Sequence, residues 1–128
     1  MTVSTSQNFK LGRLKKRSEF LHVRGGKYKA KGGIVIQVRE TASLQSADMR
    51  VGFTATKKIG NAVIRNRAKR RLREIARTLL PKLGQKGMDY VFIARDSTVS
   101  RPYEALLDDG QKALLSLRDE PLRKKPHG

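Results

Sequence analysis

One segment, between Asn61 and Pro81, limits most strongly what this chain can fold into. Its apolar side chains recur at the spacing of a helix and fall on one stripe, which consists of Ala68, Leu72, Ile75, Ala76 and Leu79. Asn61 can cap the start of this helix, and Pro81 is expected to end it because proline lacks the backbone donor. A long helix with a single apolar face must pack against a second layer, which the rest of the chain has to supply.

Strands are expected to supply that layer. The segment GGIVIQVRE (residues 32–40) has the alternation of a half-buried strand, with Ile34, Ile36 and Val38 on one face and Val35, Gln37 and Arg39 on the other. In RVGFTATKK (residues 50–58) one face carries Val51, Phe53 and Ala55, and the other is small, polar and open, with Gly52, Thr54 and Thr56. MDYVFIAR (residues 88–95) is nearly all apolar, as expected of a strand covered on both faces.

Two more helices complete the predicted order. Ser18 can cap a short helix that runs through Val23, with Phe20 and Val23 on one face and Gly25-Gly26 at its end. Pro102 opens a last helix, whose core face is expected to be Tyr103, Leu107, Leu114 and Leu117. The resulting α-β-β-α-β-α order, with room for an extra short strand near Tyr28, predicts an α+β fold. Its strand–helix–strand unit implies a parallel pair joined to an otherwise antiparallel sheet.

The charge of the chain indicates its partner. It has 29 Lys and Arg residues against 11 Asp and Glu residues, which gives a formal net charge of +18. Such a field attracts polyanions, and each cation that neutralises a phosphate releases counterions, so nucleic acid is the expected partner. The alternative is that the charge serves solubility alone, but a soluble protein normally needs only a small net charge with both signs mixed on its surface. A membrane surface is the minor rival.

Composition also bounds the compartment and the domain count. The chain has no cysteine, which excludes disulfides, thiol redox chemistry and a cysteine-based zinc site. Its first residues lack the apolar stretch of a secretory signal, and no segment approaches the ~20 apolar residues of a membrane span, so we expect a cytoplasmic protein. The 128 residues suit one domain, expected at 14–118, between a flexible segment at 1–13 and a flexible basic tail at 119–128.

The long helix also carries the densest charge. Its segment RNRAKRRLRE (residues 65–74) places six cations within nine positions: Arg65, Arg67, Lys69, Arg70, Arg71 and Arg73. On a helix they form two adjacent rows, one with Arg65, Lys69 and Arg73 and one with Asn66, Arg70, Arg73 and Arg77. Arginine binds phosphate bidentately, so this basic ridge suits an RNA backbone with its bound water or metal ions. The alternative is a solvated face on which Glu74 pairs with Arg70 or Arg71, yet one carboxylate cannot neutralise six cations.

A second basic surface is expected where the strand at 50–56 leads into the helix. Lys57 and Lys58 follow the small strand face, and Gly60 precedes the helix cap. A groove between that face and the short helix with Phe20 would let a single strand lie on small residues, stack a base and meet cations at the edges. Phe20 has a second interpretation as a core residue, because apolar residues on short amphipathic helices commonly pack inward.

The run RVGFTATKKIGNAVIRNRAKRRLRE (residues 50–74) resembles the signature block of the bacterial ribonuclease P protein family. The matching positions are Thr54, Thr56, Lys57, Lys58, Gly60, Asn61, Ala62, Arg65, Asn66, Arg67, Lys69, Arg70, Arg73 and Glu74. LKKRSEFLHV (residues 14–23) resembles the family's opening helix and DYVFIAR (residues 89–95) its late strand, so the resemblance spans most of residues 14–118.

The resemblance implies a fold and a function. The fold would be ribosomal-protein-S5-domain-2-like, a mixed four-stranded sheet packed with helices and containing a left-handed βαβ crossover. The chain would be the protein subunit of a ribonucleoprotein endonuclease whose catalytic RNA, with Mg²⁺ bound mainly by that RNA, removes the 5′ leader of precursor tRNA. The Arg-Asn-Arg helix would face the RNA, with any metal contact indirect and near Asn66, and the groove would hold the leader.

The implied RNA-binding residues are Phe20, Arg24, Thr54, Thr56, Lys57, Lys58, Asn61, Arg65, Asn66, Arg67, Lys69, Arg70 and Arg73. Two positions depart from the family pattern. Arg24 stands where members often have a second aromatic residue, and Thr54 and Thr56 stand where serines are common. We therefore expect charge to contribute more to leader binding here, and stacking less.

No catalytic residue is predicted in the chain itself. His22 and His127 are distant in sequence, and Asp108-Asp109 is expected on the solvated side of the last helix. Two other classes stay open: a ribosomal or other structural RNA-binding protein, and a stand-alone basic ribonuclease whose catalytic groups only folding would bring together. No obligate protein partner is implied.

Overall fold

The computed structural model describes residues 11–41 and 48–119. Its elements are β1 (Leu11–Arg13), α1 (Arg17–Arg24), β2 (Lys27–Lys31), β3 (Ile34–Glu40), β4 (Met49–Thr54), η2 (Lys57–Ile59), α2 (Ala62–Leu83), β5 (Met88–Ala94) and α3 (Tyr103–Asp119). The strand predicted near Tyr28 is β2. The expected C-terminal tail lies outside the described residues except for Asp119, which ends α3.

The strands form one mixed sheet in the order β1-β4-β5-β3-β2. The predicted parallel pair is confirmed, since β4 and β5 are parallel neighbours joined through α2, while β3 is antiparallel to both β5 and β2. The expectation that the rest of the sheet is antiparallel is wrong, because β1 also pairs with β4 in parallel. The predicted count of four strands is one too low. Residues 11–13, expected in a flexible segment, form β1 beside β4, and the backbone N–H of Leu14 continues this pairing to the carbonyl of Val51 at 3.0 Å. β1 is formed by backbone pairing with β4, and its three residues are too few to show the alternation of apolar and polar side chains that predicts a strand. The handedness of the crossover stays a prediction.

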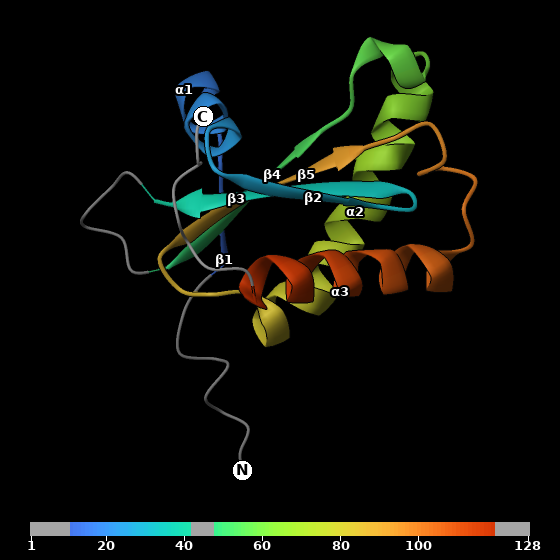
Figure 1. Cartoon of the computed structure of the whole chain (residues 1–128). Helices are drawn as coiled ribbons and strands as arrows, with labels where there is room; N and C mark the ends of the chain where they lie inside the picture. Colours follow the sequence, from blue (N-terminus) through green and yellow to red (C-terminus); the bar gives the residue numbers. More distant parts are fainter. Residues whose placement is uncertain (1–10, 42–47, 120–128) are drawn as a thin grey trace, which may run out of the picture.

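The core lies between one face of the sheet and helices α2 and α3, and α1 lies on the opposite face (Figure 1). All five residues of the predicted apolar stripe of α2 are buried, and so are Ile34, Ile36 and Val38 of β3. β5 lies between β4 and β3 and is buried along nearly its whole length, as its apolar sequence predicts. Within residues 11–41 and 48–119, no helix combines the length and apolar character that crossing a membrane requires.

The ends of two helices differ from the predictions. α1 begins at Arg17, not after Ser18, because the carboxylate of Glu19 accepts the backbone N–H groups of Lys15 and Lys16 at 2.7 and 3.0 Å. α2 continues past Pro81 to Leu83. A proline this close to the helix end removes only one of the last backbone bonds, so the helix does not have to stop there.

The buried face of α3 is centred differently from the prediction. Leu114 and Leu117 are buried as expected, but Leu106 takes the place given to Tyr103, which is 37% exposed, and Leu107 is only partly buried. The buried residues Leu106, Gly110, Ala113 and Leu117 follow the helical repeat, and Tyr103 begins the helix outside this stripe.

Candidate nucleic-acid interface

A network of charged groups fixes α1 over the sheet. The guanidinium of Arg50, on β4, donates to both oxygens of Asp89 at 3.0 and 2.8 Å, to Glu19 at 3.1 Å and to the Thr41 hydroxyl at 3.2 Å. Asp89 is 1% exposed, so this ion pair is largely shielded from water. Hydrogen bonds from the backbone of Lys16 and Lys15, together with Arg50, hold the pKa of Glu19 below its usual range. Glu19 therefore both starts α1 and ties it to the sheet.

Phe20 is seated on a glycine. A Cβ atom placed on Gly52 would lie 2.5 Å from the Phe20 ring, closer than any real contact, so the ring rests directly on the β4 backbone. Phe20 also packs on a small cluster formed by Leu14, Val23 and Val91. The two interpretations that the sequence leaves open for Phe20 are therefore compatible, because the partly buried ring packs on the sheet and also borders an open groove.

That groove lies between α1 and the sheet face that the core helices leave uncovered. It has a volume of about 620 Å³ and is lined by Lys15, Arg17, Phe20, Leu21, Arg24, Gln37, Thr54, Thr56, Val91 and Ile93. Its sheet side consists of small or apolar side chains together with Gln37, whereas the cations come from α1 and the residues before it. The structure thus brings together four of the predicted site residues: Phe20, Arg24, Thr54 and Thr56.

Lys57 and Lys58 lie in η2, which joins the end of β4 to the start of α2, and both are exposed. Asn61 caps α2 as predicted, and its side-chain oxygen accepts the N–H of Ile64 at 3.0 Å. The two lysines therefore lie on the connection between the groove and the helix, although neither borders the groove itself.

The predicted basic ridge divides into cations with and without internal partners. Asn66, Arg67 and Arg70 are exposed, and neither arginine has a side-chain hydrogen bond or ion pair within residues 11–41 and 48–119. Arg65 donates to the carbonyl of Gly60 at 3.2 Å, and Arg73 lies over the Phe53 ring, 5.7 Å from its centre. Lys69 is partly buried.

Arg71 departs from the sequence interpretation, whereas Glu74 agrees with it. Arg71 donates to the carbonyls of Thr98 and Val99 at 2.8 and 2.6 Å, so it secures the loop after β5. Glu74, the carboxylate offered as a neutralising partner, forms no ion pair in the part of the chain that the structure describes. The ridge thus keeps its positive charge unneutralised along its exposed side.

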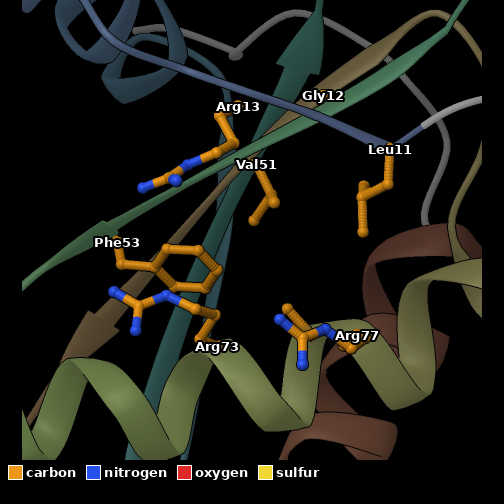
Figure 2. A pocket seen from close by; sticks show the side chains of 8 residues that line it. Leu11, Gly12, Arg13, Val51, Phe53, Arg73 and Arg77 are labelled. Atoms are coloured by element: carbon orange, nitrogen blue, oxygen red, sulfur yellow. The ribbon is translucent and has the colours of Figure 1, made fainter.

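A second, smaller hollow lies between β1 and α2 (Figure 2). Its volume is about 170 Å³, and its lining combines an apolar floor with three cations: Leu11, Gly12, Val51, Phe53, Ala76, Arg13, Arg73 and Arg77. Among the residues that the structure describes, no acidic side chain borders it. Sequence reasoning missed Arg13 because its segment was expected to be flexible, and only the pairing of β1 with β4 brings it to α2.

A protein-bound metal ion requires ligand side chains that lie close together. Within residues 11–41 and 48–119, no group of three or more His, Asp or Glu side chains could hold a metal ion, so the described residues alone do not fit a protein-bound Mg²⁺. The ring of His22 lies 2.9 Å from the carbonyl oxygen of Glu40, and His127 lies outside the described residues.

The prediction for Asp109 is wrong. Asp108 is exposed and pairs with Lys112 at 3.0 Å. Asp109 is buried, and it accepts hydrogen bonds from the N–H of Gly33 at 2.9 Å and from Nε and Nη2 of Arg101. Burial opposes its ionisation, yet these donors outweigh it and keep the pKa of Asp109 below its usual value. Its role is to join α3 to the turn between β2 and β3.

Comparisons with known proteins identify the family of this chain. The Ribonuclease P family model matches residues 10–118. The chain is 50% identical over 105 residues to the ribonuclease P protein component of Ruegeria pomeroyi, covering 81% of this chain and 84% of that protein. It is 51% identical over 108 residues to that of Caulobacter vibrioides, covering 84% and 72%.

Among solved structures, the ribonuclease P protein of Thermotoga maritima superposes with a TM-score of 0.65 at 28% identity, covering 85% of this chain and 98% of that one. The matched region contains the whole groove and the whole basic ridge, and it excludes only the two ends of the chain. The chain therefore belongs to the ribonuclease P protein family and is a bacterial protein component of that tRNA-processing ribonucleoprotein.

Proposed function

We propose that this chain binds the catalytic RNA of ribonuclease P through the ridge on α2 and holds the single-stranded 5′ leader of precursor tRNA in the groove beside α1. The observation that carries the proposal is the connection of these two surfaces through η2, one rich in unneutralised arginine and the other floored by small and apolar side chains. Arginine without an internal partner binds phosphate, while a flat floor with an aromatic border suits unpaired bases.

In this proposal the RNA carries out the cleavage and holds the Mg²⁺ ions. The chain's own residues bind and orient: cations on α2 fix the protein on the RNA, and the groove keeps the leader in register so that the scissile phosphate reaches the RNA's active site. Asn66, which is exposed like Arg67 and Arg70, would contact water bound to the RNA backbone, because its amide both donates and accepts hydrogen bonds. Cytoplasmic localisation is part of the same proposal, since the RNA and its substrate are made there.

Reconstitution with a bacterial catalytic RNA at low Mg²⁺ tests the proposal. We expect the protein to restore cleavage of precursor tRNA at a Mg²⁺ concentration where the RNA alone is inactive, because cations on the ridge offset the repulsion between RNA and substrate. Cleavage by the protein with no RNA present would instead indicate a stand-alone ribonuclease. Co-purification with ribosomal subunits, and without a several-hundred-base catalytic RNA, would indicate a ribosomal protein.

A further inference from the structure

A second aromatic side chain lies on the same sheet face as the groove. In the antiparallel pair β2–β3, Tyr28 is directly opposite Gln37, and side chains of directly opposite residues share one face of a sheet. Gln37 in turn is opposite Val91, and Val91 is beside Gly52. One row therefore crosses the sheet from Gly52 through Val91 and Gln37 to Tyr28.

This row passes through the groove and ends on an aromatic ring at each side. Phe20 covers Gly52 at one end, Val91 and Gln37 line the groove between, and Tyr28 is on the edge strand β2 at the other end. Tyr28 is 66% exposed, so its ring faces solvent instead of the core. Arg24, which also lines the groove, is four residues before Tyr28 and supplies a cation on the same side.

The spacing of strands gives the length of this row. Three strand-to-strand steps of about 4.8 Å separate Gly52 from Tyr28, which makes a span of about 14 Å. Stacked nucleotides rise about 3.4 Å each along one strand, so the span corresponds to about four nucleotide steps. A single-stranded polyanion with flat apolar groups fits this surface, because cations border the groove and the row that crosses it ends on two rings.

We propose that Tyr28 is a second stacking residue for the single-stranded leader, binding a base about four nucleotides from the base that meets Phe20. This inference rests on the proposed function and adds to it a binding residue and a minimum leader length. A leader of one or two nucleotides reaches one ring, and a longer leader reaches both. Stacking on a ring accepts any base, so Tyr28 extends the contact without selecting a sequence.

Three holoenzyme variants test the inference, each assayed with precursor tRNAs whose leaders have one, two, four, six and eight nucleotides. Tyr28→Ala should weaken binding of the long-leader substrates by about fivefold or more and leave the shortest leaders unchanged. Tyr28→Phe, which keeps the ring, should bind like the wild type. Tyr103→Ala removes the other exposed tyrosine, on α3 across the sheet, and should change nothing at any length. Melting temperatures of the free variants detect damage to the fold.

A fluorescent base analogue placed at each leader position in turn locates the contact. Tyr28→Ala should restore the quenched fluorescence at one position, and Phe20→Leu at another about four nucleotides away. A loss for Tyr28→Ala that is equal at all leader lengths, or no loss at all while Phe20→Leu weakens leader binding, would overturn the inference. If neither variant affects leader-bearing substrates, the groove is not the leader site and the proposed function itself fails.

Discussion

The groove and the ridge are both basic surfaces, but they differ in what lies beneath the charge. In the groove, cations from the α1 side border a floor of mostly small and apolar side chains, including Thr54, Val91 and Ile93. On the ridge, Arg67 and Arg70 are exposed on the convex surface of helix α2, which offers no flat surface for a base. A surface of the first kind can hold unpaired bases, whereas one of the second kind meets phosphates alone. RNA binding by the ridge should therefore depend strongly on salt, and binding by the groove should depend on whether the tRNA carries a leader.

The comparison also shows that net charge overstates the charge available to RNA. Arg50, Arg71 and Arg101 each donate to protein oxygens, and removal of any of them would disturb the fold first. The arginines that remain for RNA are those that lack such partners, and the sequence pattern does not distinguish the two groups.

The largest effect is expected on the ridge. The double substitution Arg67→Gln and Arg70→Gln should weaken assembly with the catalytic RNA by about 30-fold, because each cation contributes on the order of 1 kcal/mol. It should also reduce the salt-dependence slope of log K by about 2, since two fewer counterions are released. Filter binding of the protein to the catalytic RNA over a series of salt concentrations measures both quantities.

Two matched changes sharpen this prediction. Arg118→Gln, at an exposed arginine on α3, should leave affinity and slope nearly unchanged. Arg71→Gln should lower the melting temperature, because it frees two loop carbonyls, with little change in slope. Equal slopes for all these variants would mean that the charge of +18 acts diffusely, and the ridge would lose its special role.

A smaller, more selective effect is expected in the groove. Phe20→Leu keeps apolar packing on Leu14, Val23 and Val91 but removes the flat ring. Leader-bearing precursor tRNA should bind about fivefold or more weakly, since stacking contributes on the order of 1–3 kcal/mol per base, while mature tRNA should bind as before. Holoenzyme affinities for the two tRNAs, together with the melting temperature, separate this from fold damage. An equal loss on both tRNAs would assign Phe20 to the core alone.

The smallest effect is expected at the base of α1, through pH. Glu19 has a lowered pKa in the folded chain, so its stabilising effect is complete above its usual value of 4.5 and disappears as pH falls through the folded value. Glu19→Gln should therefore cost on the order of 1 kcal/mol at pH 6, and the difference from the wild type should shrink below pH 4.5. Thermal unfolding between pH 3 and about pH 7 measures it. Asp108→Asn, in an exposed pair, serves as the control. A constant difference across this range would contradict the assigned role of Glu19.

The sequence predicts the ridge better than the groove, and the reason is the range of the interactions. Asn61, the apolar stripe and the row of cations lie on one helix, so its period alone arranges them. The groove needs contacts across the sheet: Phe20 lies on Gly52, and Tyr28 reaches the groove face only through its register with Gln37.

The same reason explains the errors. β1 has only three residues and gains its order from pairing with β4, which local pattern cannot reveal. The helical repeat of α3 predicts that Asp109 is exposed, but hydrogen bonds from the N–H of Gly33 and from Arg101 allow its carboxylate to be buried. Ser18 is a common helix cap, yet Glu19 reaches back to two backbone donors and moves the start of α1.

The most direct test of two chemically separate surfaces is the ratio of holoenzyme affinities for leader-bearing and leaderless tRNA, measured over a salt series. The Arg67→Gln and Arg70→Gln variant, assembled at saturating protein, should keep the wild-type ratio while its assembly with the catalytic RNA weakens. Phe20→Leu should lower the ratio at every salt concentration and leave assembly unchanged, because stacking depends little on counterions. A ratio that follows the ridge substitutions and ignores Phe20 would contradict the account.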